Sequence, residues 1–263
     1  MNRISAQRPV RNTSGSGRSG SVAVTFMDVL YIVIPAYNEE DNIRAVIDAW
    51  YPIIETHPGN GKSRLVFIND GSRDRTGEIL REQKNSRPLL TVLCKSNGGH
   101  GPAVMLGYRY ALSRHADYIF QTDSDGQTDS ADFELFWKHR KRYDAIFGNR
   151  TRREDGASRI WIERILCLIL KLYFGVSVPD ANAPFRLMTA AYLREFLPKL
   201  PHDYVLPNAL LTVMGVCTGR KTAFHEISFR PRRKGRNSVN YRRIFSIAVQ
   251  ALRGFGTIRA RMR

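Results

Sequence analysis

Two carboxylates and an amide directly follow a short apolar segment near the middle of this 263-residue chain. Residues 118–122 have the composition of a buried strand, and Asp123, Asp125 and Gln127 then occupy alternate positions. In an extended segment, alternate side chains share one side. Such oxygen ligands suit Mg²⁺ or Mn²⁺, which often bridge to substrate phosphates. The pattern predicts a metal site, with a plain polar turn after the strand as the alternative.

Polar clusters of the same kind follow the other apolar segments. Strands are predicted at 29–34, 65–68, 89–94, 118–122 and 145–148. Polar residues follow the first four of them, at 37–39, 69–70, 95–101 and 123–127. Helical patterns separate these strands, at 43–50, 76–83, 102–111 and 131–141. This alternation predicts an α/β fold with a mostly parallel sheet and helices on both faces. Because ligands bind beyond the carboxyl ends of such strands, we expect the four clusters to meet in one crevice.

The alternation weakens after residue 150. Further helices are predicted at 159–174, 190–197 and 208–217, a strand at 223–229 and a basic helix at 241–253. Neither an internal repeat nor a second core is visible. We therefore expect a disordered basic tail at 1–26, one domain at 27–240 and a basic C-terminal helix or tail at 241–263.

The formal net charge of +17 is concentrated at the two ends of the chain. Residues 1–26 and 227–263 contain many arginines and no Asp or Glu. This asymmetry indicates a polyanionic partner, either anionic lipid headgroups, a phosphorylated substrate or nucleic acid. A basic surface that only keeps the protein soluble is the alternative. Nucleic acid is not expected, because it would not explain the acids at the strand ends and no recognition fold is visible.

Cysteine usage and hydropathy favour a cytoplasmic protein. The three cysteines lie far apart, in no metal or redox spacing, and indicate a reducing compartment. The longest apolar run, 165–176, is interrupted by Lys171 and is shorter than the roughly 18 residues that span a bilayer. The basic helix at 241–253 has an apolar side, so we expect peripheral contact with anionic lipid at the inner face of the membrane. Packing of that helix against the domain is the alternative.

The four clusters resemble, in order and spacing, the motifs of family 2 glycosyltransferases of the GT-A fold, a Rossmann-like nucleotide-diphospho-sugar transferase fold. The matching segments are 34–40, 69–74, 98–107 and 123–127, and the resemblance covers about residues 28–240. The Asp-x-Asp-x-Gln form is most similar to the polyprenyl-phosphate (dolichyl-phosphate mannose synthase-like) branch. The resemblance implies a metal-dependent, inverting hexosyltransferase that uses a nucleotide sugar, a polyprenyl phosphate acceptor and Mg²⁺ or Mn²⁺.

The resemblance also implies roles for the residues at the strand ends. The residues that would bind the donor are Pro35, Tyr37, Glu39, Asn69, Asp70, Gly99, Asp123 and Ser124. Position 69 is often Asp in the family. Because this chain has Asn69 instead, the resemblance does not specify the nucleotide base of the donor. Asp123, Asp125 and Gln127 would bind the metal ion, with Asp125 as a catalytic group. The ion would stabilise charge on the departing nucleoside diphosphate.

The acceptor phosphate would be bound by four arginines at positions similar to the family's basic residues. They are Arg150, Arg159, Arg186 and Arg232. Guanidinium groups suit this role because they are permanently charged and pair bidentately with phosphate. An acceptor hydroxyl on a saccharide is the alternative and would need a general base, for which Asp203 is the candidate. A nucleotidyltransferase is less favoured, because 35–41 is not a basic Gly-rich loop.

Overall fold

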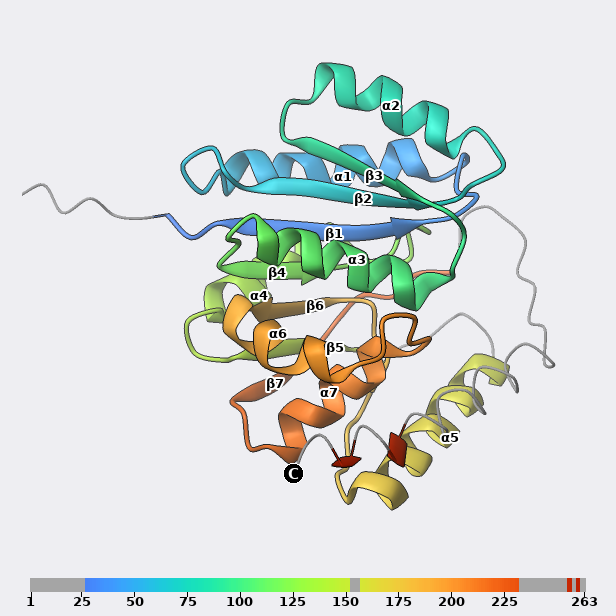
Figure 1. The fold of residues 1–263 in the computed structure, drawn as a ribbon, viewed down its shortest axis with the longest axis vertical. Coiled ribbons are helices and arrows are strands. Elements are labelled where there is room, and N and C mark those ends of the chain that lie inside the picture. The colour runs from blue at the N-terminus through green and yellow to red at the C-terminus, as the bar shows by residue number, and fades with distance from the viewer. Residues whose placement is uncertain (1–26, 152–156, 232–254, 257–258, 261–263) are drawn as a thin grey trace, which may run out of the picture.

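The computed structural model describes residues 27–151, 157–231, 255–256 and 259–260, and of residues 157–160 only the backbone. Seven strands form one sheet in the order β3-β2-β1-β4-β6-β5-β7 (Figure 1). The strands are β1 (Leu30–Ala36), β2 (Arg64–Asp70), β3 (Leu90–Lys95), β4 (Tyr118–Gln121), β5 (Ala145–Asn149), β6 (Arg186–Thr189) and β7 (Thr222–Glu226). The α-helices are α1 (Ile43–Thr56), α2 (Thr76–Ser86), α3 (His100–Ser113), α4 (Phe133–His139), α5 (Ala157–Phe174), α6 (Ala190–Phe196) and α7 (Pro207–Cys217). Two short 3-10 turns, η1 (Ser130–Asp132) and η2 (Leu197–Lys199), complete the described elements.

All the strand pairs are parallel except those made by β6, which pairs antiparallel with both β4 and β5. The predicted α/β architecture is therefore confirmed. Strand β6 was not predicted, because a four-residue strand beside a helix has too few positions to display a period. The last predicted strand is also shorter than expected, since β7 ends at Glu226. Beyond it, Phe229 forms only an isolated bridge with Thr128.

Strand β1 lies in the interior because apolar side chains cover both of its faces. All seven of its residues are buried. Alternate positions enter different cores: Tyr31 and Val33 pack with α3, α6 and α7, whereas Ile32 and Ile34 pack with α1, α2 and α4. This period of two is the geometry of a pleated strand between two helical layers. The layers are visible on the two faces of the sheet in Figure 1.

An aromatic cluster supports the end of β4, where the sequence places the candidate metal ligands. The ring centroid of Phe120 lies 5.3 Å from that of Trp50, 5.1 Å from that of Phe133 and 4.7 Å from that of Phe185. These rings come from β4, α1, α4 and the segment before β6. Aromatic pairs at these separations add stabilisation beyond the area they bury. The segment that follows Phe120 is therefore attached to a tightly packed part of the core.

The predicted ends of the domain are only partly visible. The tail at 1–26 and the basic helix at 241–253 lie outside the described residues, so the predicted domain limits stay predictions. After that gap, Phe255 is buried and its ring centroid lies 5.4 Å from that of Tyr173 and 5.3 Å from that of Phe174. Among the described residues, none of the helices combines the length and apolar character needed to cross a bilayer.

Helix α3 approaches the sheet closely at Gly107. A Cβ atom at this position would lie 2.3 Å from Val33 Cγ1 and 2.8 Å from Ile68 Cδ1. Both neighbours are buried side chains of the sheet, so little room exists for them to move. The helix can lie against β1 and β2 only because residue 107 has no side chain.

We predict that Gly107→Ala lowers the free energy of unfolding by about 1–3 kcal/mol, because overpacking outweighs the better helix propensity of alanine. Urea denaturation measures the change. Ser113→Ala, at the exposed end of the same helix, is the control and should change stability by less than about 0.5 kcal/mol. A more stable Gly107→Ala protein would contradict the close approach.

Candidate active site

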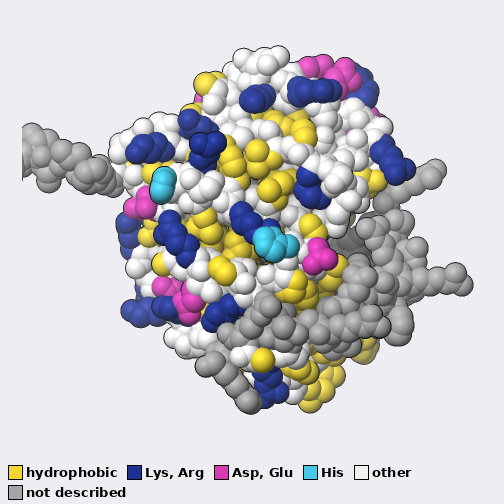
Figure 2. All heavy atoms as spheres, viewed as in Figure 1, with side chains coloured by type: hydrophobic (Ala, Val, Ile, Leu, Met, Phe, Trp, Pro, Cys, Tyr) yellow, Lys and Arg dark blue, Asp and Glu magenta, His cyan; other side chains and the backbone are white. Residues whose placement is uncertain are grey.

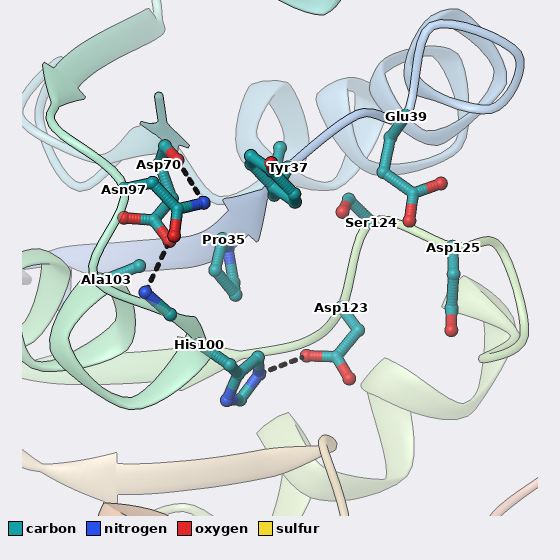
Figure 3. Close-up of a pocket in the computed structure, with 12 residues that line it drawn as sticks. Pro35, Tyr37, Glu39, Asp70, Asn97, His100, Ala103, Asp123, Ser124 and Asp125 are labelled. Atoms are coloured by element: carbon teal, nitrogen blue, oxygen red, sulfur yellow. Dashed lines mark hydrogen bonds and ion pairs between the residues drawn. The ribbon is translucent and has the colours of Figure 1, made fainter. Parts of the chain in front are cut away.

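A cavity of about 270 Å³ opens at the carboxyl ends of β1, β2 and β4, beside the first turn of α3 (Figure 3). It is lined by Pro35, Ala36, Tyr37, Glu39, Asp70, Asn97, Gly99, His100, Ala103, Asp123, Ser124 and Asp125. All four predicted clusters contribute to this list. The structure thus brings together residues that are up to 90 positions apart in the chain, from Pro35 to Asp125.

The loops after β1 and β2 hold each other in place. Asn38 N–H donates to Ser72 Oγ, and Asn38 Oδ1 accepts from Arg73 N at 2.8 Å. Glu39 N–H donates to Thr76 Oγ1 at 2.8 Å, while the Glu39 carboxylate accepts from Asn42. These contacts fix the position of Tyr37, whose ring is 41% exposed on the cavity wall. A flat, partly exposed ring of this kind is suited to stacking against another ring.

Asp70 organises the glycine loop that precedes α3. Its side chain is nearly fully buried, and its oxygens accept from Gly98 N at 3.0 Å and from Gly99 N at 2.7 Å. Lys95 forms an ion pair with the same carboxylate. Gly99 adopts φ 92°, a conformation that favours glycine. Asp70 therefore lines the cavity but uses most of its hydrogen-bonding capacity on the protein itself.

Asn69 does not line the cavity. Its side chain is buried and its Oδ1 accepts from Ser72 N at 3.0 Å, which closes the turn after β2. A Cβ atom on Gly77 would lie 2.8 Å from Asn69 Nδ2, so the amide packs closely on the first turn of α2. The structure therefore places Asn69 behind the cavity wall, as a residue that shapes the turn.

Asp123 is held by two neighbours on the cavity side of the sheet. Its Oδ1 lies 3.0 Å from His100 Nε2 and accepts from Gln121 Nε2 at 3.1 Å. Desolvation lowers the pKa of the His100 imidazole, but the charge and hydrogen bond of Asp123 outweigh it and raise the pKa above its usual value. Neither His100, for which the sequence favoured a structural role over contact with the donor, nor Gln121 was among the predicted site residues. A histidine directly after a glycine loop was the available signal for the first, whereas Gln121 lies inside a buried strand and gave none.

The donor set at Asp123 and Asp125 fits a divalent cation with few protein ligands. Both side chains line the same cavity (Figure 3). In the described part of the chain, no group of three or more His, Cys, Asp or Glu side chains is placed to hold a metal ion. Mg²⁺ in particular keeps several waters and binds through one or two carboxylates together with substrate phosphates. A two-carboxylate site of this kind therefore matches a cation that is completed by a phosphorylated ligand.

The third predicted metal ligand, Gln127, is buried beside Asp125. Its side chain is only 2% exposed, and its amide nitrogen donates to the Arg230 carbonyl oxygen at 2.9 Å. Its backbone N–H donates to Asp125 Oδ1 at 3.2 Å. Gln127 connects the loop after β4 to the segment at 227–230. Its backbone N–H also helps to position Asp125, and its role as a metal ligand stays a prediction.

The guanidinium of Arg150 is paired within the protein. Its Nε and Nη2 lie 2.7 and 2.9 Å from the two carboxylate oxygens of Asp180, and Nη2 lies 3.5 Å from Glu163 Oε2. Desolvation raises the pKa of Asp180, but the bidentate pair with Arg150 outweighs it and leaves the pKa below its usual value. Desolvation and the charge of Asp180 raise the pKa of Glu163. Arg150 therefore connects β5, α5 and the segment before β6.

The side chain of Arg186, a predicted acceptor ligand, is completely buried. Its nitrogens donate to the carbonyl oxygens of Ala183 at 3.1 Å and Asn208 at 2.9 Å, and its guanidinium lies over the Phe147 ring. These bonds satisfy the backbone of the segment that leads into β6 and of helix α7. Arg186 is thus a structural residue beneath the site.

Three further candidate residues are not seen in the cavity lining, either because they are wholly or partly outside the described residues or because they lie elsewhere. Arg232 lies outside the described residues, and only the backbone of Arg159 is described, in the first turn of α5. Asp203 is exposed in the segment between η2 and α7 and does not line the cavity. This segment packs on α3, since a Cβ atom on Gly101 would lie 2.2 Å from the Tyr204 carbonyl oxygen. Asp203 therefore belongs to a loop beside the cavity.

We predict that Asp70→Asn lowers the free energy of unfolding by about 2–3 kcal/mol, because an amide nitrogen would face backbone donors and leave Lys95 unpaired. It should also speed amide hydrogen exchange at Gly98 and Gly99. Urea denaturation and hydrogen-exchange mass spectrometry measure the two effects. Asp48→Asn, in a surface pair with Arg87, is the control and should cost less than about 1 kcal/mol. Unchanged exchange in the glycine loop would exclude Asp70 as its organiser.

Known proteins resemble this chain in sequence. The undecaprenyl-phosphate 4-deoxy-4-formamido-L-arabinose transferase of Pectobacterium carotovorum subsp. carotovorum (strain PC1) is 22% identical over 225 residues, 84% of this chain and 65% of that protein. The dolichyl-phosphate beta-glucosyltransferase of Trichomonas vaginalis is 27% identical over 174 residues, 61% of this chain and 53% of that protein. The chain spans about half to two thirds of the length of these curated relatives.

Solved structures share the fold. Glucosyl-3-phosphoglycerate synthase from Mycobacterium tuberculosis, in complex with Mn²⁺, UDP-glucose and phosphoglyceric acid, has a TM-score of 0.63 at 17% identity, over 87% of this chain and 80% of that one. S. aureus TarS in complex with UDP-GlcNAc has a TM-score of 0.55 at 16% identity, over 84% and 66%. This likeness confirms the predicted GT-A fold.

The family is shown by the sequence itself. The model of "Glycosyl transferase family 2" matches residues 31–197, which is more than half of the chain. The match begins in β1 and ends at the start of η2, so it includes every residue that lines the cavity. On this evidence the chain belongs to glycosyl transferase family 2.

Proposed function

We propose that this chain transfers a hexosyl group from a nucleotide-diphosphate sugar to a polyprenyl phosphate, in the cavity at the carboxyl ends of β1, β2 and β4. The observation that supports this most strongly is the meeting of Asp123 and Asp125 with Tyr37, Asp70 and the glycine loop around one cavity. The names of the curated relatives support the acceptor class, since both include a polyprenyl or dolichyl phosphate.

The nucleoside would enter beside Pro35 and Tyr37. The Tyr37 ring offers a face for the base, and the neighbouring Glu39 and Asp70 close the wall of the cavity. The diphosphate would lie near Gly99 and His100, at the N-terminus of α3, where the helix dipole favours an anion. Ser124 lies between the two aspartates and would contact the donor there.

Asp123 and Asp125 would hold Mg²⁺ or Mn²⁺ against the diphosphate. When bound, the ion supplies a positive charge that stabilises the departing nucleoside diphosphate. Among the residues that line the cavity, His100 is the one base, whereas Glu39, Asp70, Asp123 and Asp125 are acids. A diphosphate placed among four carboxylates needs a cation for electrostatic reasons, which supports this assignment. His100 and Gln121 keep the Asp123 carboxylate oriented towards the cavity.

The transfer would proceed with inversion at the anomeric carbon. An acceptor oxygen forms a bond to that carbon from one face while the bond to the diphosphate oxygen breaks on the other, and the electron pair leaves with the diphosphate. A phosphate acceptor is already an anion near neutral pH and needs no strong general base. A saccharide hydroxyl would have to lose a proton, and Asp203 is the exposed carboxylate on the neighbouring loop.

The acceptor phosphate would approach from the side of Arg150 and α5. Because Asp180 occupies the Arg150 guanidinium, phosphate binding there requires exchange with that carboxylate. Arg159 and Arg232 would bind the same phosphate, as the family resemblance implies. Peripheral contact of the basic C-terminal helix with anionic lipid, at the cytoplasmic face, remains a prediction of the sequence.

We predict that at least one of UDP-, GDP- and dTDP-sugars raises the melting temperature in the presence of Mn²⁺, because a ligand that binds the folded state stabilises it by mass action. Asp125→Ala should remove the Mn²⁺-dependent part of this shift and abolish transfer. Asp41→Ala, an exposed aspartate of the β1–α1 loop, is the matched control and should keep both. Metal-dependent turnover in Asp125→Ala would refute the ligand assignment.

Substitution of Asp203 tests whether the acceptor is a phosphate or a hydroxyl. If the acceptor is a phosphate, Asp203→Asn should retain most of the transfer to a short-chain polyprenyl phosphate, measured with labelled donor. If the acceptor is a hydroxyl, the same substitution should reduce transfer by at least about 100-fold, the usual contribution of a general base. Collapse of activity towards the polyprenyl phosphate would contradict the proposed acceptor.

A further inference from the structure

Helix α5 presents a continuous apolar stripe to solvent. Trp161, Ile165, Leu168 and Leu172 are 62%, 52%, 54% and 79% exposed, respectively. They are spaced at i, i+4, i+7 and i+11, so they lie along one face of the helix. Large exposed apolar side chains that are contiguous in this way mark an interaction surface, whereas scattered ones do not. We call these four residues the α5 stripe.

The opposite face of α5 is firmly seated on the domain. Leu170 is completely buried in the core beneath α3, α6 and α7, and Leu166 and Cys167 pack against the same core. Glu163 Oε1 accepts from the backbone N–H groups of Ala181 at 3.0 Å and Asn182 at 3.3 Å. The α5 stripe is therefore the exposed side of a helix whose opposite side is packed on the domain. Figure 1 shows α5 at the edge of the molecule, away from the sheet.

The charges beside the α5 stripe are positive. Arg164 and Lys171 are exposed on the same helix, and the Arg164 guanidinium lies 6.0 Å from the centre of the Trp161 ring. Glu163 is the one acid in the α5 sequence, and it points inward to Arg150. The side of the molecule drawn in Figure 2 also displays more Lys and Arg than Asp and Glu. The solvent face of α5 thus combines apolar and cationic groups without a carboxylate.

We propose that the α5 stripe docks this protein on an anionic lipid surface. Ile165, Leu168 and Leu172 would enter the boundary between headgroups and acyl chains, Trp161 would lie at headgroup level, and Arg164 and Lys171 would contact anionic headgroups. An amphipathic helix with Trp and Leu on one side and basic residues beside them is the pattern of a helix that lies in the membrane interface.

The charge of the molecule favours lipid over a second copy of the chain as the occupant. A symmetric pair of α5 helices would bring Arg164 and Lys171 of both copies together, on molecules that each have a net charge of +17. Anionic lipid instead neutralises these charges, and each basic residue adds to binding near such a surface. Docking through α5 needs neither donor nor acceptor, so it goes beyond the proposed function.

Vesicle co-sedimentation of the full chain tests the proposal. We expect binding to phosphatidylcholine vesicles that contain phosphatidylglycerol, with weaker binding to phosphatidylcholine alone. The double substitution Ile165→Glu and Leu168→Glu should lower the partition coefficient by about tenfold or more, because it removes two apolar anchors and adds negative charge. Leu135→Glu is the matched control: Leu135 is 44% exposed on α4, away from the stripe, and its substitution should leave binding unchanged.

Trp161 supplies an independent readout of contact. The chain has three tryptophans, and Trp50 and Trp137 are only 2% and 9% exposed, so a blue shift of emission on adding vesicles reports chiefly on Trp161. The shift should disappear in Trp161→Phe. Donor-induced thermal stabilisation should persist in the double variant, so a failure of docking is distinguishable from a failure of the proposed function.

Three results would overturn the proposal. Equal vesicle binding by the wild type and the double variant would assign membrane contact to other basic segments. A dimer of the wild-type chain that the substitutions dissociate, measured by light scattering, would assign the stripe to a second copy. A melting temperature lowered by the substitutions in the absence of vesicles would show that the chain itself covers the stripe.

Discussion

The parallel register of β1, β2 and β4 is the constraint on which the rest of the structure depends. It places the carboxyl ends of three strands at one edge of the sheet, where their loops must share a small volume. The loops are then fixed by hydrogen bonds to one another, from Asn38 to Ser72 and from Gly98 and Gly99 to Asp70. The cavity is the space that these mutually held loops leave open.

Burial of charge explains why so many polar groups at this edge serve the fold. A buried carboxylate is tolerated only with hydrogen bonds and a counter-charge, and Asp70, with Lys95 and two backbone N–H groups, satisfies that requirement internally. Asp180 does the same with Arg150. Asp123 and Asp125 differ, because they are only partly buried and face the cavity. This difference in exposure separates the buried carboxylates of Asp70 and Asp180 from the two partly exposed ones at the cavity.

Most of the fold followed from short apolar runs and from helical periods of 3.6 residues. The apolar run of β1 and the apolar stripes of α1 and α3 were visible in the sequence, and so were the polar residues after the strands. Strand β6 was not, because its four residues owe their place to antiparallel pairing with β4 and β5, which are distant in sequence. Tertiary context also decides the surroundings of two candidate ligands, which the sequence does not reveal. Arg186 donates to the Asn208 carbonyl oxygen in α7, and Gln127 donates to the Arg230 carbonyl oxygen.

A crystal structure with Mn²⁺ and a nucleoside diphosphate, using the anomalous scattering of manganese, tests the central claim most directly. The account predicts an anomalous peak beside the carboxylates of Asp123 and Asp125, with the diphosphate bridging to it from the first turn of α3. A nucleotide bound away from this cavity, or a manganese peak that neither aspartate contacts, would contradict the account.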